Sequence, residues 1–166
     1  MSTQVLDPAQ PCTVVSPAAV VDLLCAAHDA PLRRARLCLH EDSGDPLHEM
    51  IIAFWRGSYV APHRHRGKSE SFHVMQGEIE VVFFDDEGAL TSRVVLSASD
   101  PARPRVYRLR QPLWHTVVVR SECAVIHEIT NGPFRQEDTE IASWAPAPLD
   151  PAAMARFQSR LSSRSP

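Results

Sequence analysis

Three side chains that can bind a metal ion fall within eight residues of the sequence, at His63, His65 and Glu70. His63 and His65 are two positions apart, so on a β-strand both imidazoles lie on the same face. Gly67 begins a short segment in which the chain can turn, and Glu70 can then start the next strand with its carboxylate directed into the same space. Imidazole and carboxylate together suit divalent iron, manganese, nickel or zinc. The spacing therefore predicts a site for one divalent metal ion.

His115 is the best candidate for a fourth ligand. It precedes a β-branched run at residues 116–119, which is typical of a central strand, and its ring could enter the same interior. Four protein ligands on an octahedral ion leave two positions for water or a substrate. The predicted site is therefore compatible with catalysis.

The other histidines are expected to have ordinary roles, because most isolated histidines are surface or hydrogen-bonded groups. His73 is out of phase with Glu70, and His127 is out of phase with Glu128, so both rings are predicted on the opposite face of their strands. The same ordinary interpretation applies to His28, His40 and His48.

Further polar residues near the histidine pair have two interpretations each. Tyr59 could donate a proton or contact a substrate, although tyrosine on a strand more often packs with its hydroxyl at the edge. Glu128 could face the cavity as a catalytic group or lie on the surface. A basic group could steer an anion such as phosphate toward the site or form a solvated rim. The basic residues in question are Arg56, Arg64, Arg66 and Lys68.

The elements that must position these side chains are mainly strands. Short β-type runs separated by turn residues extend from Arg33 to about Trp144, which predicts an antiparallel sandwich or barrel. A hairpin turn is predicted where Asp85 to Gly88 separate two runs. The clearest runs are residues 50–55, 71–75, 78–84, 93–96, 106–109, 116–119 and 124–129.

Helices are predicted on both sides of this β-region. Ser16 is a good N-cap and Pro17 suits the first helical position, so a helix should start there and end before Pro31. The pair Asp150-Pro151 can cap a second, shorter helix near the C-terminus. The first fifteen residues are expected to form a mobile arm, and residues 162–166 are expected to fray. The predicted organisation is an arm and helix (1–32), a β-barrel (33–146) and a connector with a short helix (147–166).

Composition limits the function classes. A chain of 166 residues with 44% hydrophobic residues suits one domain with one core. A net charge of -3 argues against a general nucleic-acid binder, which needs excess Lys and Arg. The apolar runs are far shorter than the about 20 residues of a membrane helix, and the basic segment of a secretory signal is missing, so a cytoplasmic protein is expected. Free thiols are predicted at the scattered cysteines, which are Cys12, Cys25, Cys38 and Cys123.

The sequence resembles the cupin superfamily. The first cupin motif is Gly, five residues, His-x-His, three or four residues, Glu, six residues and Gly, and Gly57, His63, His65, Glu70 and Gly77 match every position. Five fixed residues at matching intervals make the pattern specific. The resemblance implies an all-β cupin double-stranded β-helix, or jelly-roll barrel, with flanking short helices.

The second cupin motif is only partly present. It usually has Pro-x-Gly, then two residues, then its histidine, but here Arg110 and Pro112 occupy the Pro and Gly positions and only His115 matches. Val119 replaces the terminal Asn. Because proline cannot adopt the positive φ available to glycine, the turn before His115 is predicted to differ from the usual one.

A closer resemblance, over about residues 35–146, is to the WbuC family of cupin-fold metalloproteins. That family takes its name from a protein found with O-antigen biosynthesis functions, which implies sugar or nucleotide-sugar chemistry without fixing a reaction. The phrases that carry the resemblance are Leu39-His40 with Asp45-Pro46-Leu47, Ser58-Tyr59-Val60 before Pro62-His63-Arg64-His65, Trp114-His115-Thr116, Gly132-Pro133-Phe134 and Trp144-Ala145-Pro146.

The leading hypothesis is a metal-dependent enzyme, an isomerase or oxygenase of cupin type, acting on a small polar, sugar-related substrate that could be anionic. The ion would polarise an oxygen of the substrate or activate water or dioxygen. One alternative is a non-catalytic module that senses or sequesters a small ligand. Another is a metal-free sugar isomerase or epimerase in which His63 or His115 acts directly as the base. A hydrophobic outer sheet face is expected to pair two barrels in a homodimer.

Overall fold

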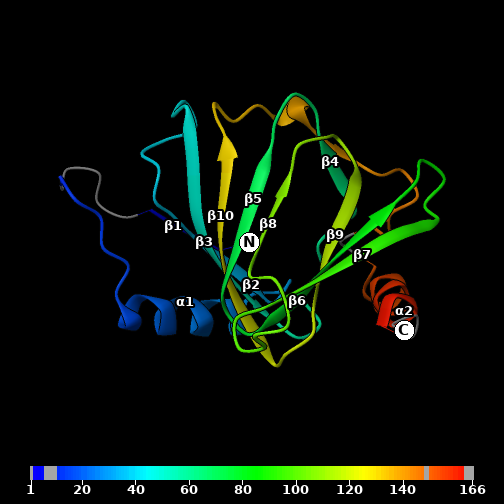
Figure 1. The fold of residues 1–166 in the computed structure, drawn as a ribbon, viewed down its shortest axis with the longest axis horizontal. Coiled ribbons are helices and arrows are strands. Elements are labelled where there is room, and N and C mark those ends of the chain that lie inside the picture. Colours follow the sequence, from blue (N-terminus) through cyan, green and yellow to red (C-terminus); the bar gives the residue numbers. More distant parts are fainter. Residues whose placement is uncertain (1, 6–10, 148–149, 163–166) are drawn as a thin grey trace.

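Two β-sheets packed face to face form the body of the protein (Figure 1). The computed structural model describes residues 2–5, 11–147 and 150–162. The six-stranded sheet has the order β1-β2-β3-β10-β5-β8, and the five-stranded sheet has the order β11-β4-β9-β6-β7. Among the described strands every pairing is antiparallel except that of β1 with β2. The expected all-β jelly-roll sandwich with flanking short helices is confirmed.

The bounds of the elements are as follows. The six-stranded sheet contains β1 (Ser2–Val5), β2 (Arg34–Cys38), β3 (Leu47–Trp55), β10 (Cys123–Asn131), β5 (Glu70–Gln76) and β8 (Val106–Leu109). The five-stranded sheet contains β11 (Thr139–Ile141), β4 (His63–His65), β9 (Trp114–Val119), β6 (Glu78–Phe84) and β7 (Leu90–Ser97). The helices are α1 (Pro17–Asp29), α2 (Pro151–Ser162) and the short 3-10 helix η1 (Gln136–Asp138).

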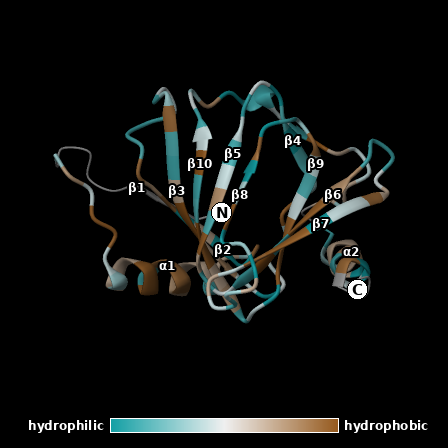
Figure 2. Ribbon diagram, viewed as in Figure 1, coloured by the Kyte–Doolittle hydropathy of each residue, from teal (hydrophilic) through white to brown (hydrophobic). Residues whose placement is uncertain are grey.

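The main core lies between the two sheets. Phe72 and Ile126 of the six-stranded sheet pack in one cluster with Val81 and Val117 of the other sheet. Figure 2 shows hydrophobic residues concentrated in the lower part of the sandwich and more hydrophilic ones toward the upper ends of β4, β9 and β10. The apolar lower part holds the sheets together, while the upper part can accommodate polar side chains.

Each helix covers an outer face at one side of the sandwich (Figure 1). In α1 the Ser16 hydroxyl accepts a hydrogen bond from the Ala19 amide at 3.2 Å, and Leu23 is buried against β2 and β3. In α2 the Asp150 carboxylate accepts from the Ala153 amide at 2.9 Å, and Phe157 packs against the other sheet. Both predicted helices and their caps are confirmed. No helix of the described part of the chain is long and apolar enough to cross a lipid bilayer.

Several strands were absent from the sequence prediction. Ser2–Val5 form β1 beside β2, where an irregular arm was expected, and residues 6–10 of that arm lie outside the described residues. Arg34–Cys38 form β2 and Thr139–Ile141 form β11. The expected fraying tail, apart from Ser162 at the end of α2, also lies outside the described residues. The prediction missed β1, β2 and β11 because these strands are short or polar.

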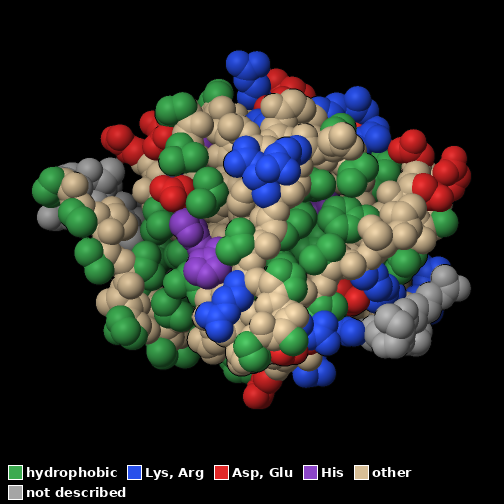
Figure 3. Space-filling view, in the orientation of Figure 1, with side chains coloured by type: hydrophobic (Ala, Val, Ile, Leu, Met, Phe, Trp, Pro, Cys, Tyr) green, Lys and Arg blue, Asp and Glu red, His purple; other side chains and the backbone are tan. Residues whose placement is uncertain are grey.

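The outer surface carries scattered apolar side chains. Val106 of β8 is 59% exposed and Met75 at the end of β5 is 43% exposed. Figure 3 shows hydrophobic side chains at the surface of one face, between basic groups. The homodimer expected from such a face stays a prediction.

Gly77 offers a test of the tight connection between β5 and β6. Its φ is +76°, and a Cβ added there would collide with the Cys123 carbonyl oxygen. Gly67 has a similar φ of +68° but nothing within 4 Å of an added Cβ. We expect Gly67→Ala to cost about 1–2 kcal/mol of unfolding free energy through its φ alone, and Gly77→Ala to cost a further 1–3 kcal/mol, roughly, through overpacking. Urea denaturation in the presence of EDTA measures the unfolding free energy of both variants. An equal loss of unfolding free energy in the two variants would contradict the predicted collision at Gly77.

Candidate metal centre

Both sheets contribute to the cluster of predicted ligands. His63 and His65 are the ends of β4, and the Cα pairing of His63 with His115 joins β4 to β9 in the five-stranded sheet. Glu70 begins β5 in the opposite sheet. His63, His65, Glu70 and His115, here called the ligand cluster, therefore meet across the interior of the sandwich.

The distances in the ligand cluster fit a single ion. One ligand atom of each residue lies within 4.8 Å of all the others. His115 Nε2 is 3.0 Å from Glu70 Oε1, and His65 Nε2 is 3.3 Å from Glu70 Oε2. Bonds of about 2.0–2.2 Å to one ion place neighbouring ligand atoms about 3 Å apart and opposite ones about 4.3 Å apart. These four residues could hold a metal ion with small adjustments of their side chains.

Hydrogen bonds to the other ring nitrogens orient two of the imidazoles. His63 Nδ1 lies 2.9 Å from the Ala61 carbonyl oxygen, and His115 Nδ1 lies 2.9 Å from the Leu113 carbonyl oxygen. A carbonyl oxygen only accepts, so both Nδ1 atoms carry the proton and both Nε2 atoms have a lone pair free for a ligand bond. His115 Nε2 is buried and makes no hydrogen bond of suitable geometry, as expected for an atom aimed at an ion.

His65 is oriented by a hydroxyl group. Its Nδ1 lies 3.1 Å from Thr139 Oγ1 on β11. The hydroxyl can either donate or accept, so it leaves the tautomer of His65 open. The edge strand β11 nevertheless fixes the plane of this ring.

Burial and charge in the metal-free cluster favour a neutral His63 and an ionised Glu70. Burial, with His115 nearby, lowers the pKa of His63 to about 3, so this ring is neutral. Burial would raise the pKa of Glu70, but the neighbouring histidines, chiefly His115, outweigh it and hold that pKa well below its ordinary value. Burial likewise lowers the pKa of His115, but Glu70 outweighs it, so the net shift is upward. An ionised carboxylate among imidazoles is a suitable environment for a divalent cation.

Tyr107 is a site residue that the sequence analysis did not identify. Its hydroxyl donates a 2.6 Å hydrogen bond to Glu70 Oε1, and its pKa is raised by burial and by the Glu70 charge. Tyr107 alternates with Leu109 on β8, and this alternation is the signal that could have placed it on the inner face. The phenol therefore helps to orient the carboxylate that His115 and His65 approach.

The turn before His115 is built around Pro112. The Leu113 amide donates to the Gln111 carbonyl oxygen at 2.8 Å, which closes a three-residue turn. Proline suits the centre of such a turn because its φ is fixed near -65°. His115 is therefore positioned by a proline turn, and the difference from the usual cupin turn stays a prediction.

A central cavity of about 520 Å³ adjoins the ligand cluster. His63 and His65 line its wall, while Glu70 and His115 lie behind them at 3% and 0% exposure. On the opposite sheet, residues of β2, β3 and β10 line the cavity, with Met50 and Thr130 among them. A small molecule in this cavity would contact the accessible side of the cluster.

Of the predicted catalytic and substrate-binding residues, Glu128 and Lys68 line the cavity. Burial and the Glu70 charge raise the pKa of Glu128 to about 8. Lys68 donates to the Pro133 carbonyl oxygen at 2.6 Å and forms an ion pair with Asp138 at 3.2 Å. Glu128 is thus placed to exchange a proton near neutral pH, whereas the Lys68 charge is already paired.

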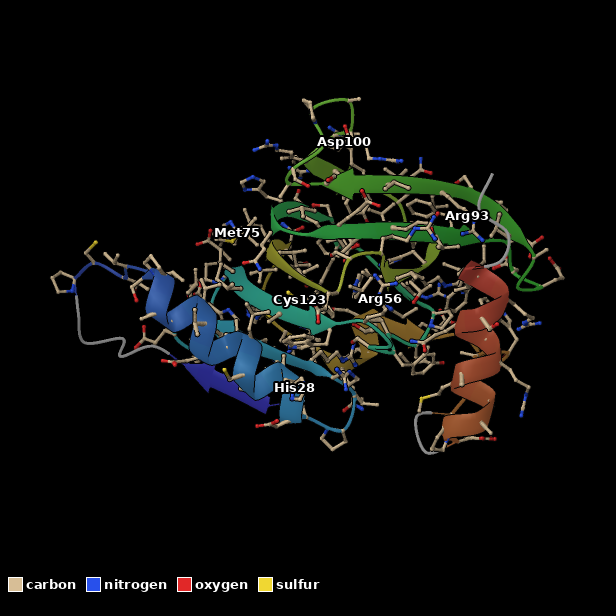
Figure 4. All side chains as sticks on the ribbon, turned by 90° about the horizontal axis from the view of Figure 1, so that it is seen from below. His28, Arg56, Met75, Arg93, Asp100 and Cys123 are labelled. Atoms are coloured by element: carbon tan, nitrogen blue, oxygen red, sulfur yellow. The ribbon has the colours of Figure 1, made fainter. Side chains whose placement is uncertain are left out.

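The structure does not bring Tyr59 or Arg56 to the cavity. Tyr59 is buried in the cluster under α2, and its hydroxyl donates to the Pro146 carbonyl oxygen at 2.6 Å. Arg56 is exposed, donates to the Arg120 carbonyl oxygen at 2.9 Å and lies beside Cys123 in the view from below (Figure 4). Both side chains have structural surroundings away from the cluster.

Arg64 and Arg66 are also outside the cavity. They alternate with the two histidines of β4 and therefore face outward. Arg64 Nε and Arg66 Nη2 donate to Glu140 Oε2 at 2.9 and 2.7 Å, and Arg64 also lies 4.1 Å from the centre of the Trp114 ring. These arginines hold β11 against β4.

The remaining histidines and cysteines lie outside the ligand cluster. His73 is exposed, and His127 faces Glu49 at 3.4 Å, as their alternation predicted. His40 and His48 stack at 4.0 Å and line the cavity, which the sequence analysis did not anticipate. All four cysteines are free thiols, as predicted, and Cys38 lies at the cavity.

Glu128 gives a testable dependence of stability on pH. Between its ordinary pKa near 4.5 and its folded value of about 8, the folded state keeps a proton that the unfolded state releases. The unfolding free energy of the metal-free protein therefore falls as pH rises through this range. We expect Glu128→Gln to remove this loss and to be more stable than the wild type at pH 8 by about 1 kcal/mol or more. Thermal unfolding at pH 5 and pH 8 measures this difference in stability, with a substitution of an exposed residue, Glu87→Gln, as the control. Identical pH profiles of the wild type and Glu128→Gln would contradict the raised pKa of Glu128.

Comparisons with known proteins identify the fold. A family model described as a domain of unknown function (DUF6016) matches residues 15–96, and no curated protein sequence matches the chain. The L-ribose isomerase of Cellulomonas parahominis has a TM-score of 0.53 at 18% identity, covering 68% of this chain and 70% of that chain. An oxalate oxidase has a TM-score of 0.53 at 16% identity, covering 82% and 76%.

A third similar structure is the capsular polysaccharide assembling protein CapF from Staphylococcus aureus, with a TM-score of 0.51 at 19% identity. The match covers 64% of this chain but only 34% of the CapF chain, so this chain spans about a third of CapF. At these identities the likeness shows the fold alone. The chain shares the jelly-roll fold of these solved structures, and the expected cupin fold is confirmed.

Proposed function

We propose that this protein is a metal-dependent enzyme that holds one divalent ion in the ligand cluster and acts on a small polar molecule in the central cavity. The observation that carries the proposal is the convergence of three imidazoles and a carboxylate within 4.8 Å at the wall of a cavity of about 520 Å³. Such a cavity is within the size range of small-molecule sites. Iron, manganese, nickel and zinc all suit this donor set.

The surrounding residues would give the ion a fixed and accessible position. The carbonyl oxygens of Ala61 and Leu113 orient two rings, and the Tyr107 hydroxyl orients the Glu70 carboxylate. A divalent ion held there would supply Lewis-acid polarisation of a substrate oxygen. Glu128, with its pKa of about 8, could take up or release a proton on a molecule in the cavity.

A sugar-related substrate is the favoured class. The resemblance to the WbuC family supports chemistry of cell-surface polysaccharides such as O-antigen. An L-ribose isomerase of the same fold has been solved with L-ribose, and CapF is a capsular polysaccharide assembling protein. These two similar structures support the proposal that a sugar-sized molecule occupies the cavity. Membership of the WbuC family, the domain boundaries at residues 32 and 146, the homodimer and the cytoplasmic location stay predictions.

Two other functions use the same cavity differently. A sensing or sequestering module would bind a ligand without turnover. In a metal-free isomerase His63 or His115 would act as the base, but a pKa of about 3 makes the neutral ring of His63 a weak base. The low pKa of His63 therefore favours a ligand role for this residue.

Metal content is the direct test. Protein purified without added metal is expected to contain about one divalent ion per chain by elemental analysis. His63→Ala and His115→Ala are expected to lower metal affinity at least about tenfold, because each removes a ligand from an oriented set. The matched control is His73→Ala, since His73 is exposed on β5, the strand that also carries Glu70. Equal metal content in all three variants would overturn the site.

Turnover separates the enzyme from the binding module. Candidate sugars and nucleotide sugars can be screened by thermal stabilisation of the metal-loaded protein and then assayed for conversion. We expect conversion of a stabilising sugar that is lost with EDTA and restored by one metal. A sugar that stabilises the loaded protein without being converted would favour the non-catalytic module.

A further inference from the structure

The wall of the cavity opposite the histidines carries two arginines from one strand. In β2 the side chains of Ala35 and Leu37 are buried against α1. Arg34 and Arg36 alternate with them and so face the other way, and both line the central cavity. The strand β2, which lies between β1 and β3, thus presents two guanidinium groups to the cavity.

Arg34 is a cation without a counter-charge. Among the described residues it forms no ion pair, and its Nε is buried without a hydrogen-bond partner. Burial, and then the charge of Arg36, lower its pKa, but a guanidinium keeps its proton in proteins. A buried charge is costly unless it is paired. This cost would be relieved by an anion in the cavity.

The acidic groups at the cavity form no ion pair with Arg34. Glu128 is near enough for its charge to act on Arg34, but no ion pair joins the two side chains among the described residues. Glu41 and Asp42 lie at the rim and are exposed, and Asp42 Oδ1 accepts from the Gly44 amide at 2.6 Å. Arg34 is therefore placed to pair with an anionic group of a ligand.

From this arrangement we propose that Arg34 and Arg36 bind an anionic group, a carboxylate or a phosphate, of the molecule that occupies the central cavity. Both anions offer oxygen pairs that match the planar donor fork of arginine. Because His63 and His65 line the same cavity from the other sheet, the anionic group would be the end of the molecule remote from the ligand cluster. The inference rests on the proposed function for this orientation, and it narrows the substrate to small acids or phosphorylated molecules.

The test uses simple anions on metal-free protein, so that metal chelation plays no part. Malonate represents a carboxylate, inorganic phosphate represents a phosphate, and uncharged malonamide is the control ligand. Binding is measured by calorimetry and by the shift of the unfolding temperature. We expect malonate, phosphate or both to bind the wild type, whereas malonamide does not, and the stronger of the two anions identifies the class.

The variants assign binding to the arginines. Arg34→Gln is expected to weaken anion binding at least about tenfold, since a hydrogen bond to a charged group is worth about 1.5–3 kcal/mol. Arg34→Lys keeps the charge and is expected to lose less. Arg56→Gln removes the same charge at an exposed site outside the cavity and is expected to bind like the wild type. Wild-type affinity in Arg34→Gln, or an equal loss in Arg56→Gln, would overturn the assignment.

A measurement on the unaltered protein covers the case in which Arg34→Gln fails to fold. Phenylglyoxal modifies accessible arginines, and peptide mass spectrometry reports each position. We expect the bound anion to slow modification of Arg34 and Arg36 but not of Arg56, and equal rates with and without the anion would overturn the proposal. If the protein binds metal but no anion, the arginine site alone is wrong. If anions bind through Arg34 and no metal binds, the metal centre alone is wrong.

Discussion

The site depends on one structural constraint, the meeting of Glu70 from one sheet with three imidazoles from the other. Pairing of β4 with β9 sets His63 beside His115, and the packing of the sandwich then brings the Glu70 carboxylate to within 3.0 Å of His115 Nε2. Desolvation of that carboxylate at 3% exposure is unfavourable unless cations or strong donors surround it. The Tyr107 hydroxyl supplies a donor, and a divalent ion would supply the charge. Burial of the Glu70 carboxylate is therefore coupled to the binding of an ion by the ligand cluster.

The sequence predicted the ligand cluster because its information is local. A two-residue interval puts His63 and His65 on one face, and Gly67, with a φ of +68°, lies in the turn that leads to Glu70. His115 was found through the β-branched run that follows it. Tyr107 was not found, because only the packing of β8 against β5, where Phe72 pairs with Tyr107, brings its hydroxyl near Glu70. Contacts between strands far apart in the chain are not encoded in spacing.

Sequence spacing also did not show which basic residues face the cavity. Arg64 and Arg66 are close to the motif in sequence but face outward, and they hold the edge strand β11 through Glu140. That strand also carries Thr139, which contacts His65, so these arginines act on the site indirectly by fixing its edge. The arginines that do line the cavity belong to β2, a short strand that was not among the predicted runs. Periodicity separates two faces of a strand, but it does not say which face is interior.

The polarity of the cavity follows from its two walls. The five-stranded sheet contributes imidazoles backed by the Glu70 carboxylate, and the six-stranded sheet contributes Arg34, Arg36 and a carboxyl that burial keeps mostly protonated. In a low-dielectric interior, charges of this kind interact strongly with a ligand and with one another. A divalent ion on the first wall would add positive charge and lower the pKa of Glu128, so its proton would be released more readily once the site is loaded. Metal loading, the charge of the ligand and the proton on Glu128 are therefore linked, and a molecule with electron-rich groups at both ends satisfies both walls at once.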